Sequence, residues 1–127
     1  LTLNKNKISK VSKEIKLMRN LVHLELSRNR FTSFPVEITA LKNLKVLVLS
    51  RNHLTAITKE IANLKNLESL DLWSNEIGNI PNEIDQLKKL KYLDLRVDPL
   101  NDKVQRKIID LVPNTKVYFS KPCNCGY

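Results

Sequence analysis

Leucine and asparagine recur along this chain at a fixed step of 23 residues. Three columns of leucines fall in register at that step: Leu21, Leu44, Leu67 and Leu90; Leu24, Leu47, Leu70 and Leu93; and Leu26, Leu49, Leu72 and Leu95. An asparagine column follows them, with an aspartate in its last place: Asn6, Asn29, Asn52, Asn75 and Asp98. A fixed period of this kind predicts an array of similar units that stack on one another and share one core.

The same step divides the chain into units. The expected boundaries are a partial repeat at 1–20, full repeats at 21–43, 44–66 and 67–89, a final repeat with its cap at 90–120, and a C-terminal tail at 121–127. Because a single repeat cannot bury its apolar face alone, we expect residues 1–120 to form one domain. Leu1 stands in the place of Leu24. We therefore expect the natural chain to begin earlier, and the first repeat to present an uncapped apolar edge.

The first half of each unit predicts a short strand. In the unit 44–66, Leu47 and Leu49 lie on one face of an extended segment, and Val46 and Val48 lie on the other. Asn52 follows, and a polar amide beside buried leucines must find backbone partners in its own turn and in the neighbouring one. Stacked asparagines then form a ladder, in which loss of one side chain costs about 1–3 kcal/mol.

The second half of each unit predicts a return path on the outer side of the stack. Inward-pointing apolar pairs mark this path: Phe31 and Phe34, Leu54 and Ile57, Ile77 and Ile80. Pro35 and Pro81 suit the first position of a short helical turn, where a missing N–H does no harm. A glutamate follows within each turn: Glu37, Glu60 and Glu83. Since the helical side is wider than the strand side, we expect the stack to bend and its parallel strands to line a concave face.

The last unit departs from the pattern and predicts a cap. Asp98-Pro99-Leu100 replaces the usual turn, and Asn101 or Asp102 can cap a longer helix. The apolar face of that helix comprises Val104, Ile108, Leu111 and Val112. Residues 116–119 alternate as a final strand that points Val117 and Phe119 inward. A solenoid needs such a cap to shield the end of its core.

Composition and charge narrow the class of protein. Of the 127 residues, 42% are hydrophobic, which is enough for a continuous core, and no apolar run approaches the roughly 18 residues of a membrane span. The net charge is +9, but no segment interleaves basic residues with aromatic ones. The charge therefore favours a solvated basic rim over a nucleic-acid site. We therefore expect no nucleic-acid partner.

The repeated E-I-x-x-L-K-N-L-x-x-L-x-L-S-x-N string resembles the leucine-rich-repeat proteins, and in particular a 23-residue class common in bacteria, including surface or secreted proteins of pathogens. The resemblance covers about residues 1–120, and the segment 111–119 resembles the terminal cap of those proteins. It implies an α/β solenoid with a parallel β-sheet on the concave face, short helical or 3₁₀ turns on the convex face and a C-terminal helix–strand cap. Two departures are Asp98 for asparagine and Thr58 for proline, and we expect neither to disturb the fold.

The resemblance also implies a function. Such proteins are binding scaffolds, usually for another protein, with no chemistry and no cofactor of their own. It favours, slightly, a secreted or cell-surface location in a bacterium over a cytoplasmic one. The sequence names neither the partner nor the oligomeric state.

The outward-facing strand positions are free to bind a partner, because the inward ones fill the core. At a strand spacing of about 4.8 Å these positions form four columns. The columns are His23, Val46, Ser69 and Tyr92; Thr2, Glu25, Val48, Asp71 and Asp94; Asn4, Ser27, Ser50, Trp73 and Arg96; and Lys5, Arg28, Arg51, Ser74 and Val97.

These columns predict an apolar patch with a charged rim. The patch comprises Val46, Val48, Trp73 and Tyr92, and its rim comprises His23, Glu25, Asp71, Asp94, Arg28, Arg51 and Arg96. Trp73 is the only tryptophan, and the repeat predicts that its side chain faces solvent. An exposed aromatic anchor within a charged rim is typical of a binding hot spot. We therefore predict that these residues bind a protein partner.

Two other groups of residues carry side chains that are capable of chemistry. We expect Asp71 and Asp94 side by side, as the two carboxylates of a retaining glycosidase are. Because they lie on an open face beside Arg96, the sequence favours a non-enzymatic function. Cys123 and Cys125 supply two zinc ligands of the four required, so a metal site there is only a weak alternative to free or intermolecularly oxidised cysteines in a tail.

Two alternative functions stay open at the level of sequence. One is a structural or oligomerising module that associates through the uncapped N-terminal edge. The other is an adhesin that binds an anionic surface through a basic rim, formed by Arg19, Lys42, Lys45, Lys65, Lys88, Lys89 and Lys91. Solubility of a repetitive apolar array also explains such a rim.

Overall fold

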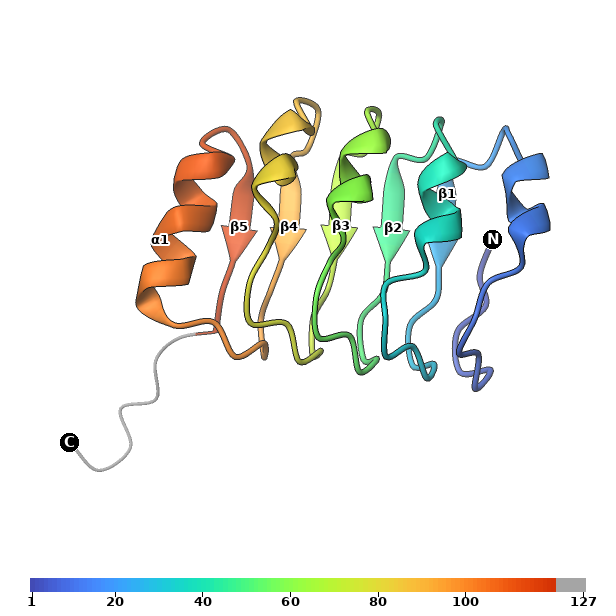
Figure 1. Cartoon of the computed structure of the whole chain (residues 1–127), viewed down its shortest axis with the longest axis horizontal. Coiled ribbons are helices and arrows are strands. Elements are labelled where there is room, and N and C mark those ends of the chain that lie inside the picture. The colour runs from blue at the N-terminus through green and yellow to red at the C-terminus, as the bar shows by residue number, and fades with distance from the viewer. Residues whose placement is uncertain (121–127) are drawn as a thin grey trace.

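Each repeat from residue 21 onward contributes one three-residue strand to a parallel sheet, and the cap adds a fifth strand. The computed structural model describes residues 1–120 (Figure 1). Its strands are β1 (His23–Glu25), β2 (Val46–Val48), β3 (Ser69–Asp71), β4 (Tyr92–Asp94) and β5 (Lys116–Tyr118). They pair in chain order, β1-β2-β3-β4-β5, and every pairing is parallel. Thr2 bridges to Glu25 and continues the sheet into the first partial repeat.

Helical segments cover the opposite side of the stack. Four of them are 3₁₀ helices, η1 (Lys13–Leu17), η2 (Val36–Ala40), η3 (Lys59–Asn63) and η4 (Asn82–Gln86), and one is the α-helix α1 (Asp102–Leu111). Figure 1 shows the helices side by side in one layer and the strands in another, with α1 beside β5 at one end. The predicted α/β solenoid, with strands on its concave side and 3₁₀ turns on its convex side, is confirmed.

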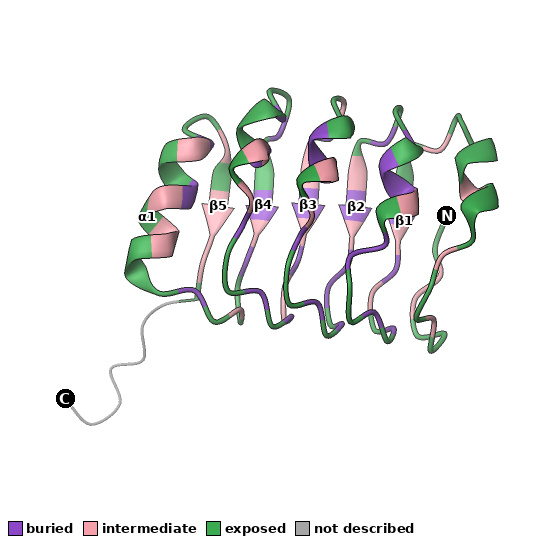
Figure 2. Ribbon diagram, in the orientation of Figure 1, coloured by how far each residue is buried: buried purple, intermediate pink, exposed green. Residues whose placement is uncertain are grey.

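The core lies between the two layers (Figure 2). The central residue of each repeat strand points into it, and Leu24, Leu47 and Leu93 are each 0% exposed. Full burial of a leucine side chain contributes about 1.5–3 kcal/mol relative to exposure, so the repeated leucines dominate the stability of the stack.

The asparagine ladder forms as the repeat predicts. The Asn52 Oδ1 atom accepts a hydrogen bond from the Phe31 N–H at 3.1 Å. Its Nδ2 atom donates to the carbonyls of Leu26 and Leu49, each at 3.0 Å. Asn75 makes the same bonds one repeat later, to the Leu54 N–H and two carbonyls. One buried amide thus ties its own turn to the preceding repeat.

Asp98 occupies the last rung and breaks the bonding pattern. Its Oδ1 accepts from the Ile77 N–H at 3.1 Å, as the asparagines do. Its Oδ2 is buried without a hydrogen-bond partner, because a carboxylate cannot donate to the carbonyls that the amide nitrogen serves in the other rungs. Burial raises the pKa of Asp98 to about 7. The fold tolerates the substitution, but the rung is electrostatically unlike the others.

The cap agrees with the sequence in most respects. Asn101 is the N-cap of α1 and its side chain accepts from the Val104 N–H at 2.9 Å. Ile108 and Val112 are buried, while Val104, Leu111, Val117 and Phe119 are partly buried against the core.

The prolines lie one position earlier than expected. Pro35 and Pro81 are the N-caps of η2 and η4, not their first residues. Thr58 takes the same place before η3. Proline suits this position because its ring presets φ, which is −73° at Pro35 and −65° at Pro81.

Candidate binding site on the sheet face

The sheet register aligns the outward-facing residues as the 23-residue step requires. His23 pairs with Val46, Val46 with Ser69, and Ser69 with Tyr92. Glu25, Val48, Asp71 and Asp94 align in the same way. These side chains therefore lie in two straight columns across the sheet.

The cap strand lengthens both columns, although it lies outside the 23-residue repeat. Lys116 pairs with Tyr92, and Tyr118 pairs with Asp94. The inward alternation of Val117 and Phe119 already implied that residues 116 and 118 point outward. The face therefore carries a third aromatic side chain, on the strand next to that of Tyr92.

Trp73 is partly covered, whereas the repeat pattern predicts that it faces solvent. The Arg51 guanidinium lies over its ring, 4.7 Å from the ring centre, and the side chain is of intermediate exposure. Arg51 follows β2 and Trp73 follows β3, so the stack joins neighbouring repeats. Cation–π contact of this kind contributes about 0.5–1 kcal/mol at an exposed site, and it holds the ring in one orientation.

Arg96 connects the acidic and aromatic residues at the cap end of the face. Its Nη2 lies 2.6 Å from the Asp94 Oδ2, and its Nε lies 3.0 Å from the Asp94 Oδ1. The same guanidinium lies 5.7 Å from the centre of the Tyr118 ring. Tyr92 is 50% exposed and lies in the neighbouring column. An exposed aromatic ring therefore lies next to a paired arginine and aspartate.

Asp71 lies between these two groups and is partly buried. Burial raises the pKa of Asp71, a hydrogen bond from the Trp73 N–H to its Oδ1 at 3.0 Å opposes that shift, and the charge of Asp94 adds to it. The expected adjacency of the two aspartates is present, and so is the neutralising arginine beside Asp94. The arrangement resembles a charge network more than a catalytic pair, since Arg96 already binds one carboxylate through two contacts.

His23 and Glu25 form a separate group at the first strand. The His23 Nε2 lies 2.8 Å from the Glu25 Oε1, and the Asn4 Nδ2 donates to the Glu25 Oε2 at 2.9 Å. The hydrogen bond from Asn4, followed by that with His23, lowers the pKa of Glu25. These residues lie on the same face as Trp73 but are already paired with each other. Val46 and Val48 separate them from the aromatic group.

Arg28 and Arg51 lie at the edge of the face, where each strand turns away. Both have left-handed backbones, with φ of 54° and 55°. Both side chains are exposed.

The basic rim at the opposite edge is partly neutralised. Glu68 pairs with Lys91 at 2.9 Å and with Lys45 at 4.0 Å. Lys89 donates to the Asn66 Oδ1 at 2.8 Å, which adds no opposite charge.

The structure bears on a metal site and on a membrane-spanning helix only for residues 1–120. Cys123 and Cys125 lie outside the residues that the structure describes, so the weak metal alternative is not addressed. Within residues 1–120, no three His, Cys, Asp or Glu side chains gather closely enough to hold a metal ion. In the same range, every helix is too short or too polar to cross a membrane.

Comparisons with known proteins identify a family with this geometry. The family model for a leucine-rich repeat region matches residues 1–116. No curated protein matches the chain. Among solved structures, a leucine-rich-repeat protein of Leptospira interrogans is similar, with 40% identity and a TM-score of 0.90 over 94% of this chain. That match covers 30% of the Leptospira chain, so the present chain spans less than a third of its length.

More distant structures share the architecture. The leucine-rich-repeat ectodomain of the receptor kinase SOBIR1 from Arabidopsis thaliana is 26% identical, with a TM-score of 0.72 over 95% of this chain and 67% of that one. Internalin C2 from Listeria monocytogenes, at 22% identity, has the same fold, with a TM-score of 0.75 over 94% of this chain and 51% of its own. Proteins of this family generally serve as non-enzymatic scaffolds for protein interaction. The family model, the repeat register and the asparagine ladder agree, and the chain belongs to the leucine-rich-repeat family.

Proposed function

We propose that this protein binds a protein partner through the concave face of its sheet, with Trp73 as the main anchor. The observation that supports the proposal most strongly is that Trp73, Tyr92 and Tyr118 lie on the same face of the sheet, two of them beside arginine guanidinium groups. Tryptophan, tyrosine and arginine are the residue types enriched in binding hot spots.

The arginines beside these rings support the proposal, because they order the rings before a partner binds. A ring already held by Arg51 loses less rotational freedom when a partner covers it, so more of its buried area contributes to affinity. The bond between Arg96 and Asp94 likewise fixes the guanidinium beside Tyr118 before binding. Val46 and Val48, both partly buried, extend the apolar area toward β1.

The proposal is tested by replacing Trp73 with alanine. Immobilised wild type and Trp73→Ala are incubated with extracts of candidate target cells, and captured proteins are quantified by mass spectrometry. Val36 lies on the convex side and is 41% exposed, so Val36→Ala is the matched control. We expect at least one protein to be captured by wild type and the control but reduced more than tenfold with Trp73→Ala, since a hot-spot truncation costs 2 kcal/mol or more. Capture that is unchanged by Trp73→Ala contradicts the proposal.

We further propose that the protein acts at a bacterial surface, on a host or surface partner. The support is the 40% identity to a Leptospira protein and the bacterial character of the 23-residue repeat. Brief protease treatment of intact source cells should remove the protein, whereas protection until the cells are lysed contradicts a surface location.

Self-association is a second candidate function. Apolar side chains of the first partial repeat line a hollow of about 350 Å³, among them Leu1, Leu3, Ile8, Val11 and Ile15. A second copy could cover these residues, because exposed apolar patches mark interaction sites. Light scattering over a range of protein concentrations tests this: a mass that rises to a dimer supports self-association, and a constant monomer mass contradicts it.

A further inference from the structure

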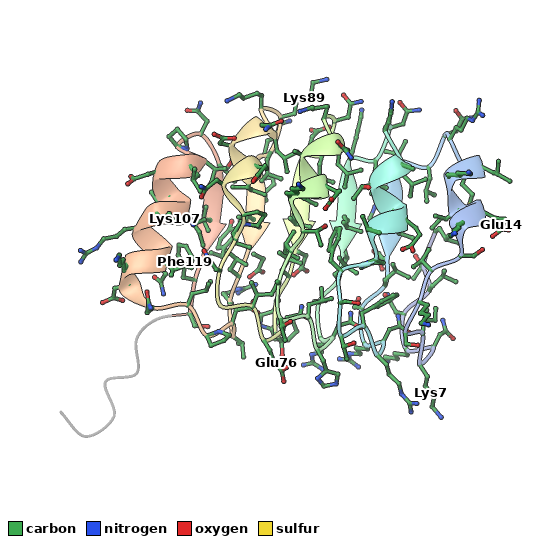
Figure 3. The ribbon with its side chains drawn as sticks, viewed as in Figure 1. Lys7, Glu14, Glu76, Lys89, Lys107 and Phe119 are labelled. Atoms are coloured by element: carbon green, nitrogen blue, oxygen red, sulfur yellow. The ribbon has the colours of Figure 1, made fainter. Side chains whose placement is uncertain are left out.

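Five cationic side chains lie together at the edge where the strands turn through the asparagine ladder. They fall in two columns over three successive repeats: Lys5, Arg28 and Arg51 in one, Lys7 and Arg30 in the other. All five are exposed. Figure 3 labels Lys7 and Glu76 at this edge and Lys89 at the opposite edge of the stack.

No carboxylate neutralises these five charges within the described part of the chain. The ion pairs of residues 1–120 join other groups, and the one nearest to this cluster in the repeat is that of His53 with Glu76, at 3.9 Å. Glu25, on the adjoining face, is already bonded to Asn4 and His23. This differs from the opposite rim, where Glu68 lies between two lysines.

The backbone gives no folding reason for cations at these positions. Lys5, Lys7, Arg28 and Arg51 have φ values of 60°, 58°, 54° and 55°. This left-handed region favours glycine and asparagine, and long side chains gain nothing from it. Like charges on adjacent rungs also repel one another. Apart from the stack of Arg51 on Trp73, the row of lysines and arginines here is explained by an anionic ligand better than by local stability.

The extent of the cluster limits the ligand to a short one. Adjacent rungs are about 4.8 Å apart, so three rungs span roughly 10 Å. Beyond the third repeat the same two columns continue with Ser74, Glu76 and Val97, which offer no cation and one carboxylate. A long polyanion lying along the whole edge would meet Glu76, whereas a short acidic stretch would not.

The position of Arg51 joins the cluster to the concave face. Its guanidinium covers the Trp73 ring, so a partner bound at Trp73 lies beside Arg51, at one end of the cluster. Arginine also matches the carboxylate in geometry, since it can donate two parallel hydrogen bonds to it.

We propose that this edge binds a short segment of aspartate and glutamate residues that belongs to the protein partner of the concave face. The proposal rests on the proposed function, because it takes the partner to be a protein. It assigns the concave face to apolar and aromatic contacts, and the asparagine-turn edge to an acidic stretch that continues from them.

The test uses a fluorescein-labelled oligoglutamate peptide and fluorescence anisotropy at low ionic strength. The variant Lys7→Glu/Arg30→Glu changes two exposed residues that are not among those of the proposed concave-face site. The control, Lys42→Glu/Lys65→Glu, makes the same change of net charge on two adjacent rungs of the opposite rim. We expect the first variant to bind about tenfold more weakly and the control to stay within about twofold of wild type, because removal of close ion pairs weakens binding more than a distant change of net charge.

Three outcomes overturn the proposal: no salt-sensitive binding of the peptide by wild type, an equal loss in both variants, or a larger loss in the control. Lys7→Gln/Arg30→Gln, which only removes charge, must show a smaller loss in the same direction, and its thermal midpoint should match that of wild type. Heparin serves as the long-polyanion arm, and competition by heparin that depends mainly on Lys42 and Lys65 also counts against the proposal.

Failure here is distinguishable from failure of the proposed function. Oligoglutamate has no apolar group for Trp73, so Trp73→Ala should leave its affinity within about twofold of wild type. If Trp73→Ala leaves partner capture unchanged while the edge variant still loses peptide affinity, then the concave-face proposal fails and the acidic-segment site stands. If Trp73→Ala abolishes partner capture while the edge variant keeps the peptide affinity of wild type, only the edge site is contradicted.

Discussion

Replacing Asp98 with asparagine should stabilise the protein at neutral and alkaline pH. In the other rungs the amide Nδ2 donates to two carbonyls, as Asn75 does to Leu49 and Leu72, each at 3.0 Å. By the repeat, the corresponding carbonyls at the last rung are those of Leu72 and Leu95. Asp98 has no donor for them when ionised, and its Oδ2 is buried without a partner. Asp98→Asn supplies the missing donor and removes a poorly solvated charge.

The raised pKa sets the size and direction of the effect. Asp98 has a pKa of about 7 in the fold against 3.8 as its ordinary value. The folded state therefore holds the proton more tightly than the unfolded state, and stability falls as pH rises from about 4 to about 7. The full shift corresponds to at most about 4 kcal/mol. Asp98 is not fully buried, so solvent screening reduces the expected loss to about 1–2 kcal/mol.

The assay is urea unfolding of wild type and Asp98→Asn at several pH values between 4 and 8.5. We expect the variant to exceed wild type by about 1–2 kcal/mol at pH 8, and the difference to shrink as pH falls from about 7 to about 4, because Asp98 of folded wild type is then protonated and can donate. The comparison cancels the titration of groups that do not interact with Asp98. A difference that stays constant with pH, or a variant less stable at pH 8, refutes the reasoning.

Two further predictions concern the ladder and the stacked tryptophan. Asn52→Ala should lower the free energy of unfolding by about 1–3 kcal/mol, because it leaves buried backbone groups without partners, while Asn43→Ala at an exposed hydrogen bond should cost less than 1 kcal/mol in the same urea assay. Arg51→Ala should uncover Trp73 and raise the acrylamide quenching of its fluorescence, whereas Arg28→Ala, one repeat away, should leave quenching unchanged. Equal losses of stability in Asn52→Ala and Asn43→Ala contradict the first prediction. Equal quenching in Arg51→Ala and Arg28→Ala contradicts the second.

The period of the sequence predicts most of the fold. Once leucines recur every 23 residues, the inward face of each strand, the register of its neighbours and the asparagine ladder all follow. Leu47 and Asn52 are buried for that reason, and Val46 aligns with Ser69 for the same reason. Such features depend on position within the repeat and not on the identity of neighbouring side chains.

What the period does not predict depends on contacts between particular side chains. Arg51 covers Trp73 because two long side chains of neighbouring repeats meet. The repeat aligns equivalent positions only and does not reveal a contact between different positions. The altered pKa of Asp98 depends on its depth in the last rung. Tyr118 joins the face through the cap strand, which lies outside the repeat pattern.

Site-specific photo-cross-linking tests the central claim most directly, namely that the partner lies on the concave face. A photoreactive benzoylphenylalanine is placed at Ser69, between Val46 and Tyr92 in one column, and in a second protein at Lys59 on the convex side. Both are irradiated with the captured partner. The account predicts a cross-linked product from position 69 and none above background from position 59. Cross-linking from position 59 with none from position 69 contradicts it.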